Sequence, residues 1–278
     1  MFHVKQCGKG SYMSYKDVKR GNPSKKSRVL AIINQKGGVG KSTTAVNLSA
    51  ALGEENKKCL VVDFDPQGNT TSGYGIDKDS LEHDIYDALM DDYPIENLIV
   101  GTPEKKVFVV PATIQLAGAE IELVSKIARE SILKTMIESI RDEFDYVFID
   151  CPPSLGLLTI NALAAADGLL IPIQCEYYAL EGVTKLLESM KLVKASINSE
   201  LEVYGVLMTM FDKRTTLSNQ VVEEVRKYFG NKVFKMVIPR SVKVSEAPSH
   251  GLPIAMYAGM NKGAIAYRNL AREVIRRG

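Results

Sequence analysis

Short apolar runs alternate along the chain with longer segments in which apolar residues recur at helical spacing. Unbroken runs of about four to eight β-prone residues predict buried strands, and apolar residues at about every third or fourth position predict helices. The alternation predicts an α/β fold, a doubly wound, mostly parallel sheet with helices on both faces. The predicted strands are residues 29–33, 59–63, 107–111, 145–150, 168–173, 203–210 and 234–239, and the predicted helices are residues 44–52, 80–91, 116–127, 130–143, 180–197, 217–229 and 263–277.

A glycine-rich stretch, Lys36-Gly-Gly-Val-Gly-Lys41-Ser42-Thr43, follows the first predicted strand. Glycines let the backbone approach a polyphosphate, and the next helix presents its positive N-terminal end to the anion. Lys41 is placed to reach the β- and γ-phosphates, and the Ser42 hydroxyl is placed to bind Mg²⁺. Gln35 stands where the strict pattern G-x-x-x-x-G-K-[ST] has its first glycine, so the match is to the deviant phosphate loop K-G-G-x-G-K-[ST]. The predicted nucleotide-binding residues are Lys36, Gly37, Gly38, Val39, Gly40, Lys41, Ser42 and Thr43.

Carboxylates follow two of the predicted strands. Asp63 and Asp65 end the strand that begins at residue 59, and Asp150 ends the strand that begins at residue 145. The carboxyl ends of parallel strands beside a phosphate loop are where Mg²⁺ or an attacking water is held. An acid at a strand end also caps the next helix in many proteins, but the phosphate loop favours a Mg²⁺ role here. Asp150 then belongs to a Walker B element.

Charge is distributed unevenly along the 278 residues, although the net charge is only +2. Residues 1–28 carry +7, residues 29–204 carry −13 and residues 205–278 carry +8. This asymmetry indicates a polyanion partner for the last quarter of the chain, and solvated helix faces are the alternative. Because residues 1–28 lack a hydrophobic period, we expect a basic, disordered extension before a single P-loop ATPase domain at residues 29–278.

Several classes of protein are excluded by what the sequence lacks. No apolar run approaches the length of a membrane span, and the N-terminus has no signal-peptide core, so we expect a cytoplasmic protein. The cysteines have no C-x-x-C spacing, which argues against a metal site or a disulfide framework. They are Cys7, Cys59, Cys151 and Cys175.

Five ordered motifs together resemble the ParA/Soj family of chromosome- and plasmid-partitioning ATPases, within the MinD-like class of deviant phosphate-loop proteins. The resemblance covers about residues 29–278, and the last two motifs are similar to the chromosomal Soj type. The motifs are residues 34–43 (NQKGGVGKST), 62–69 (VDFDPQGN), 149–156 (IDCPPSLG), 174–182 (QCEYYALEG) and 245–251 (SEAPSHG).

The resemblance implies an ATP-dependent sandwich homodimer. Lys36 matches the signature lysine that crosses to the partner subunit's ATP phosphates, and a second cation offsets the repulsion between two buried polyphosphates. Gly37 matches a glycine whose replacement by a bulky residue blocks dimerisation. Asp65 matches the residue that orients or activates the attacking water. Asp63 and Asp150 match the acids that organise Mg²⁺ in the family.

The resemblance also implies residues that contact the adenine and the DNA. Met210, Pro239 and Arg240 fall on segments that contact the adenine in relatives. Arg214 matches an arginine needed for sequence-independent DNA binding, and Lys243 stands where close relatives have a second arginine. Lysine neutralises a phosphate but lacks the bidentate fork of arginine, so we expect Lys243 to contribute less.

The cycle implied by the resemblance begins with ATP binding, dimerisation and non-specific binding to the nucleoid. Hydrolysis, stimulated by the N-terminal segment of a ParB/Spo0J-type protein, then releases an ADP-bound monomer. Soj relatives also act on the replication initiator DnaA. The expected partners are therefore a second copy of the chain, double-stranded DNA, a ParB/Spo0J-type protein and DnaA, with no membrane.

The opening residues Met1 to Gln6 permit the codons ATG TTT CAC GTG AAA CAN, which contain the palindrome TTTCACGTGAAA. This palindrome resembles the centromere-like parS sequence that ParB recognises. We hypothesise that the first codons overlap a parS site, and a chance coincidence of six residues is the alternative. Codons that break the palindrome would end the hypothesis.

Three other functions remain as alternatives. A membrane-cycling MinD-type ATPase needs a C-terminal amphipathic membrane helix, and residues 264–277 are short with few large apolar residues. A redox ATPase of the nitrogenase-reductase kind needs cluster-ligating cysteines at an interface, for which Cys151 is misplaced. A metabolic kinase or synthetase is disfavoured by the Soj-type motifs.

Overall fold

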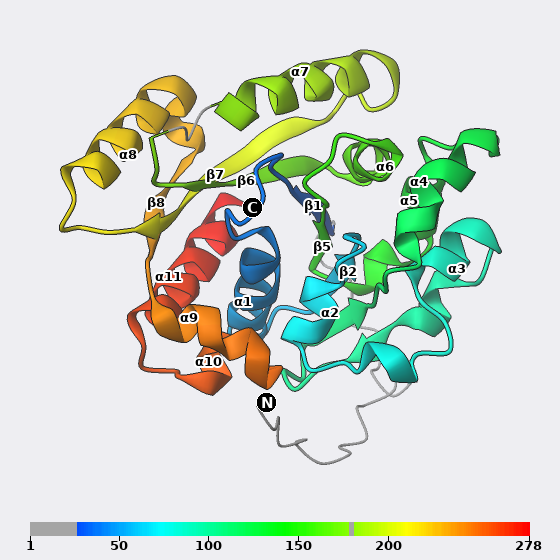
Figure 1. The fold of residues 1–278 in the computed structure, drawn as a ribbon, viewed down its shortest axis with the longest axis horizontal. Helices are drawn as coiled ribbons and strands as arrows, with labels where there is room; N and C mark the ends of the chain where they lie inside the picture. Colours follow the sequence, from blue (N-terminus) through cyan, green and yellow to red (C-terminus); the bar gives the residue numbers. More distant parts are fainter. Residues whose placement is uncertain (1–26, 178–180) are drawn as a thin grey trace.

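The computed structural model describes residues 27–177 and 181–278. Its described residues form an eight-stranded sheet in the order β3-β4-β2-β5-β1-β6-β7-β8, in which every strand pairing is parallel except that of β3 with β4 (Figure 1). The predicted extension and residues 178–180 of the fourth motif lie outside the described residues. The strands are β1 (Arg28–Ile32), β2 (Cys59–Asp63), β3 (Val100–Gly101), β4 (Val107–Val110), β5 (Tyr146–Asp150), β6 (Gly168–Gln174), β7 (Glu202–Phe211) and β8 (Val233–Pro239).

Helices cover both faces of the sheet, as the alternating pattern predicts (Figure 1). The α-helices are α1 (Lys41–Glu54), α2 (Asn69–Gly73), α3 (Ile85–Met90), α4 (Leu116–Glu122), α5 (Ile132–Ile140), α6 (Leu157–Ala165), α7 (Glu181–Ser196), α8 (Thr216–Phe229), α9 (Val242–Glu246), α10 (Ile254–Tyr257) and α11 (Lys262–Arg277). Short 3-10 turns connect several of them: η2 (Lys78–Ser80), η3 (Ile95–Leu98), η4 (Leu123–Ser125), η5 (Arg141–Glu143), η6 (Gly230–Lys232) and η7 (Ala247–His250).

The central strand β1 divides its side chains between two hydrophobic cores. Val29 and Ala31 belong to the core under helices α3 to α8, whereas Leu30 and Ile32 belong to the core under α1 and α11. This alternation follows from the two-residue period of a strand. Because both faces are covered, β1 is almost entirely apolar, which is the pattern of a buried parallel strand.

Several elements differ from the prediction for local reasons. The predicted helix at residues 80–91 is limited to α3, because Asp84 and Asp87 form a capping box that starts the helix at Ile85. Helix α6 was not predicted, since most of its residues are buried and it has no polar face to give a helical period. The predicted helices at 116–127 and 130–143 each end in a 3-10 turn, η4 and η5.

The strand order gathers three carboxyl ends at the middle of the sheet. The register pairs Ile32 of β1 with Asp150 of β5, and Asp150 is also the neighbour of Asp63 at the end of β2. The loop from β1 to α1 therefore begins beside both carboxylates. Such a position in a doubly wound sheet is where ligands bind.

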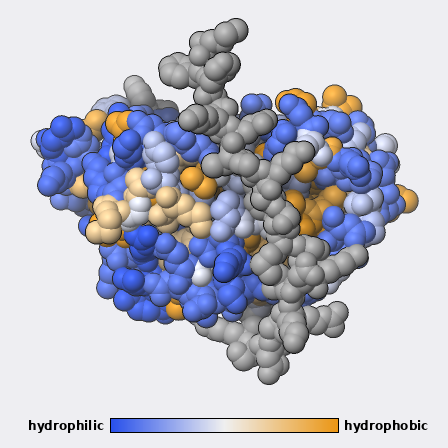
Figure 2. All heavy atoms as spheres, turned by 90° about the horizontal axis from the view of Figure 1, so that it is seen from below, coloured by the Kyte–Doolittle hydropathy of each residue, from blue (hydrophilic) through white to orange (hydrophobic). Residues whose placement is uncertain are grey.

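The surface is mostly polar. The face in Figure 2 is largely hydrophilic, with hydrophobic residues gathered in separate patches. Among the described residues, no helix has the length and apolar character needed to cross a bilayer.

Candidate nucleotide-binding site

The loop between β1 and α1 is held open by backbone geometry and by two polar anchors. Gly38 and Gly40 have φ angles of 73° and 92°, in the left-handed region that glycine adopts readily. The buried Asn34 donates to the Pro172 carbonyl at 2.8 Å and accepts from the Lys36 amide at 3.0 Å. Thr209 donates to the Val39 carbonyl at 2.8 Å. These bonds fix the loop against β6 and β7.

A cavity of about 420 Å³ opens over this loop. A Cβ atom placed on Gly37 or Gly38 would meet nothing within 4 Å, so the loop leaves room for a ligand at its backbone. Several parts of the chain contribute to the wall: the loop itself, the segment after β2, the end of β7, and η7 with the residues that follow it. The lining residues are Gly37, Gly38, Gly40, Lys41, Ser42, Thr43, Val46, Asn47, Asp65, Gln67, Asn69, Ser72, Gly73, Pro153, Met210, Pro248 and Leu252.

Lys41 is the buried cation of the cavity, with 7% of its surface exposed. Its ammonium group lies 3.4 Å from the Lys36 carbonyl. Burial lowers the pKa of Lys41, and the charges of Asp150 and Asp65 oppose that shift. The site therefore holds a partly desolvated cation, which binds an anion more strongly than an exposed lysine does.

Asp63 and Asp150 are fully buried at the ends of β2 and β5. Asp63 accepts hydrogen bonds from the Thr71 amide and hydroxyl at 2.7 and 2.6 Å, and Asp150 accepts one from the Thr70 hydroxyl at 2.8 Å. Burial, and then the charge of Asp150, raises the pKa of Asp63 to about 8. Burial raises the pKa of Asp150 to about 6, opposed by the nearby Ser42 and Thr70 hydroxyls and by Lys41.

The Oδ1 atom of Asp150 is buried and has no hydrogen-bond partner among the described residues. A buried carboxylate oxygen without a donor costs free energy, and a hard cation such as Mg²⁺ would satisfy it. Ser42, Asp63 and Asp150 together offer the oxygen ligands that Mg²⁺ prefers. The donor set therefore fits the predicted metal.

Asp65 lies in the wall of the cavity and is also buried. Its side chain accepts from the Gln67 amide at 2.9 Å, and its own amide lies 3.4 Å from Asp63 Oδ1. The turn after β2 thus fixes the position of the Asp65 carboxylate. The structure thus places Asp65 beside the phosphate loop, in the wall of the same cavity.

Lys36 points away from the buried carboxylates. Its ammonium group forms an ion pair with Glu176 at 3.2 Å, and 39% of its side chain is exposed. Glu176, just after β6, also lies 3.9 Å from the Arg240 guanidinium. The lysine is therefore held at the surface by a carboxylate of its own chain.

The predicted adenine-contacting residues are only partly brought together. Met210 lines the cavity and has a φ angle of 53°, which is unusual for a residue with a side chain. Pro239 and Arg240 do not line it, and the Arg240 amide donates to the Phe211 carbonyl at 3.0 Å. These two residues therefore lie beside the end of β7, next to Phe211.

Residues in η7 and just after it contribute to the cavity, although no role was predicted for them. Pro248 and Leu252 line the cavity. Asn47 of α1 accepts from the Ile254 amide and donates to the Thr43 carbonyl, both at 2.7 Å. The motif at residues 245–251 was the signal in the sequence, but only the fold shows that it reaches the phosphate loop.

Arg214 and Lys243 lie outside the cavity, in exposed positions before α8 and within α9. Arg214 is 82% exposed at its side chain and forms an ion pair with Asp212 at 2.7 Å. Lys243 forms one with Glu246 at 2.9 Å. The arginine lowers the pKa of Asp212, mainly through the side-chain hydrogen bond. Both predicted DNA-binding cations are therefore accessible, and each has a carboxylate neighbour.

The chain is similar to known proteins over most of its length. Residues 27–203 match a family described as an AAA domain. The sporulation initiation inhibitor protein Soj of Bacillus subtilis is 56% identical over 90% of this chain and 99% of its own. The chromosome partitioning protein ParA of Myxococcus xanthus is 52% identical, and the match covers 90% of this chain and 88% of that protein. The chromosome-partitioning ATPase Soj of Treponema pallidum is 49% identical, and the match covers 90% of this chain and 98% of that protein.

A solved structure resembles the whole fold. Cobyrinic acid a,c-diamide synthase from Mycobacterium smegmatis, with bound ADP and magnesium, superposes with a TM-score of 0.79 and 39% identity. The match covers 90% of this chain and 94% of that chain.

Proposed function

Because the chain belongs to the ParA/Soj family of chromosome-partitioning ATPases, we propose that its ATP-bound homodimer binds DNA without sequence preference and that hydrolysis releases it. The observation that carries this proposal is the cavity over the deviant phosphate loop, with Lys41, Asp65 and the unsatisfied Asp150 oxygen around it. ATP and Mg²⁺ fit this cavity by charge and by donor type. The related structure with ADP and magnesium supports the same assignment.

Within one subunit, the backbone of residues 37–43 and Lys41 bind the phosphates, and Met210 lies against the base. Ser42, Asp63 and Asp150 would hold Mg²⁺. Bound Mg²⁺ supplies positive charge to the β- and γ-phosphate oxygens. Asp65 accepts a hydrogen bond from the attacking water and so orients it. Pro239 and Arg240 lie next to Phe211, the residue that follows Met210 on β7.

Dimerisation depends on Lys36 in this proposal. Its exposed ammonium group leaves Glu176 and binds the phosphates in the partner subunit, which places a second cation on each nucleotide. The open space at Gly37 lets the partner backbone approach closely. ATP then becomes part of the interface, so its hydrolysis weakens the dimer.

DNA binding is assigned to the basic last quarter of the chain. Arg214 and Lys243 are exposed there, and dimerisation doubles the number of phosphates that they neutralise. The surface thus gains affinity when ATP joins two subunits. We propose the nucleoid as its location, a ParB/Spo0J-type protein as the activator of hydrolysis, and the initiator DnaA as a further partner.

The structure favours DNA over a membrane as the partner of the C-terminal region. Helix α11 buries Tyr267, Leu270 and Val274 in the core shared with α1, so its apolar face is already occupied. A membrane-cycling protein needs such a face to be available. The synthase identity of 39% is lower than the 49–56% of the partitioning relatives, which favours partitioning over small-molecule synthesis.

The test is ATP turnover with Mg²⁺, measured alone, with DNA, with a ParB-type protein and with both. We expect weak turnover that rises only when DNA and the ParB-type protein are both present. Flotation with liposomes should leave the protein in the unbound fraction. Turnover that ignores both additions, or ATP-dependent flotation, would contradict the proposal.

A further inference from the structure

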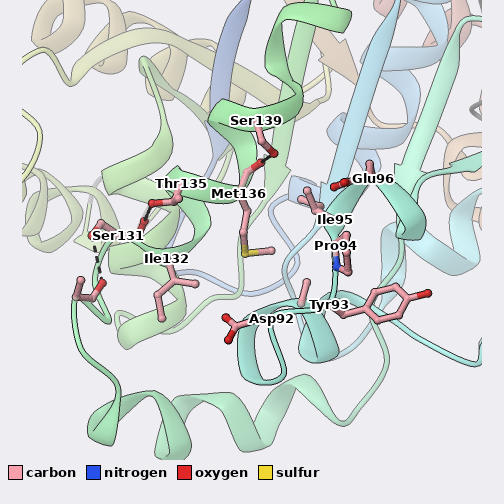
Figure 3. A pocket seen from close by; sticks show the side chains of 12 residues that line it. Asp92, Tyr93, Pro94, Ile95, Glu96, Ser131, Ile132, Thr135, Met136 and Ser139 are labelled. Atoms are coloured by element: carbon pink, nitrogen blue, oxygen red, sulfur yellow. Dashed lines mark hydrogen bonds between the residues drawn. The ribbon is translucent and has the colours of Figure 1, made fainter.

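A second cavity, of about 390 Å³, lies far from the phosphate loop, between α5 and the segment from α3 to η3. Figure 3 shows Ile132 and Met136 of α5 facing the segment that carries Asp92 to Glu96. The wall is mainly apolar, with a few hydroxyl groups. None of the five sequence motifs contributes to it, and the proposed reaction does not use it. The lining residues are Ala88, Asp92, Tyr93, Pro94, Ile95, Glu96, Ala128, Ser131, Ile132, Thr135, Met136 and Ser139.

Backbone strain is concentrated at the two cavities. Four non-glycine residues of the described chain have positive φ angles, and three of them line a cavity. Met210 lines the nucleotide cavity, and Asp92 and Ala128, with φ of 53° and 52°, line the second one. Strained residues persist where the surrounding structure holds them, and they are common at binding sites.

The rim of the second cavity extends its apolar surface. Ile127 precedes Ala128 and is 95% exposed, and Ile121 and Val124 are also exposed along α4 and η4. Large apolar side chains exposed together on one short segment mark an interaction site more often than isolated ones do. The cavity and this rim together offer an apolar groove to a peptide segment.

The rim is also acidic. Asp91, Asp92 and Glu96 are exposed, and none of these carboxylates forms an ion pair with a described residue. The cations of the neighbouring segments are Lys126, which donates a hydrogen bond to the Met90 carbonyl, Arg129, which pairs with Glu130 at 2.9 Å, and Lys134 of α5. The groove therefore suits a basic segment with large apolar side chains.

The described chain begins beside this groove. The Arg141 guanidinium donates to the Ser27 carbonyl at 2.8 Å, and Arg141 comes directly after α5. Ser139, only two residues earlier, lines the cavity. The chain that precedes Ser27 thus starts at one end of the helix that forms a wall of the groove.

We propose that residues 1–26 of the same chain dock in this groove. They contain seven basic residues and one acidic residue, together with large apolar side chains that suit the cavity. The apolar candidates are Phe2, Val4, Tyr12, Met13 and Tyr15. Docking holds these cations against the acidic rim and keeps them away from other polyanions. This proposal does not rest on the proposed function.

The lengths allow such docking. Helix α5 has nine residues and spans about 13 Å, whereas 26 extended residues reach about 85 Å. Every residue of the segment is therefore within reach of the groove. An attachment so close to the groove also gives a high effective concentration, so each individual contact need only be weak.

The test uses the full chain with a benzophenone maleimide on Cys7. The other three cysteines, Cys59, Cys151 and Cys175, are buried and so protected from the label, and Cys7→Ser is the labelling control. After irradiation of a dilute sample, mass spectrometry locates the adducts. We expect them on residues that line the groove, Met136 and Ile132 among them, and within one chain when isotopically light and heavy chains are mixed.

Charge variants of the rim separate docking from chance contact. Asp92→Asn with Glu96→Gln should lower the yield of groove adducts about threefold or more, because two exposed ion pairs are lost. Asparagine tolerates the left-handed backbone of Asp92, so the fold is retained. Glu223→Gln with Glu224→Gln, on α8 at the other end of the sheet, should leave the yield unchanged.

Three outcomes would overturn the proposal. Adducts spread over the surface would mean that the segment has no preferred site. Adducts that join light and heavy chains would assign the groove to a second copy. Groove adducts whose yield is equal in the rim variant and in the α8 control would exclude recognition by charge.

Discussion

Asp63 and Asp150 are direct neighbours on β2 and β5, and both carboxyl groups are fully buried. Two like charges at such positions repel each other, which adds to the cost of burial and raises the pKa of Asp63. Without a cation the pair is therefore a source of instability. With a divalent cation the same pair becomes a binding site, so metal binding and the stability of this edge of the sheet are coupled.

The first prediction concerns pH. The pKa of Asp63 is about 8 in the folded chain and about 4 in an unfolded one, so the folded state binds the extra proton between these values. Its contribution to the free energy of unfolding therefore falls as pH rises from about 4 to about 8. Without Mg²⁺, the melting temperature should fall less over this pH range for Asp63→Asn than for the parent. Equal pH dependence of the melting temperature in the two proteins would contradict the raised pKa of Asp63.

The second prediction concerns Gly37. A Cβ atom added at Gly37 meets no atom within 4 Å in one subunit, so Gly37→Val should leave the melting temperature and ATP binding nearly unchanged. ATP-dependent dimerisation, measured by light scattering, should be lost because the added side chain meets the partner. Gly40→Val is the contrasting variant: its left-handed backbone should destabilise the chain itself. A normal dimer with Gly37→Val would show that this loop does not approach a partner.

The third prediction concerns the ion pair of Lys36 with Glu176. Glu176→Gln removes a contact that dimerisation must break, so the ATP-bound dimer should form more readily. Exposed ion pairs contribute about 0.2–1 kcal/mol each, and a dimer breaks two of them. The dissociation constant of the ATP-bound dimer should therefore fall by about two- to thirtyfold. Glu202→Gln, which breaks the exposed pair with Lys232, is the control and should change nothing. A weaker dimer in Glu176→Gln would mean that Glu176 supports the interface.

The fourth prediction concerns the salt dependence of DNA binding. Arg214→Ala or Lys243→Ala should weaken DNA binding and reduce the slope of log K against log salt by about one to two, since each dimer loses up to two phosphate contacts. Arginine makes the stronger contact, so its loss should cost more. Lys232→Ala, in another basic turn, is the control. Fluorescence anisotropy over a salt series gives both values, and unchanged slopes would exclude the two residues.

The sequence predicted the sheet and the phosphate loop because these depend on local patterns. Strands such as β1 and β2 are buried on both faces and appear as unbroken apolar runs. The loop carries its chemistry in consecutive residues. Asp63 and Asp150 were also found from their positions at strand ends, and the register then showed them to be direct neighbours.

The sequence did not predict contacts between distant segments. Asn47, Pro248 and Leu252 meet at the nucleotide cavity only because α10 packs against α1, and η7 against α2, in the fold. The pairing of Lys36 with Glu176 likewise joins the loop to the end of β6 across 140 positions. The second cavity has no motif at all, since its walls are ordinary helix faces that leave a gap.

The central claim is that ATP joins two subunits into a DNA-binding dimer. The most direct measurement is non-specific DNA binding by the parent, Asp65→Ala and Gly37→Val, each without nucleotide, with ADP and with ATP. We predict binding by the parent only with ATP, prolonged binding by Asp65→Ala, and no binding by Gly37→Val. Equal DNA affinity of the parent in all three nucleotide states would contradict the account.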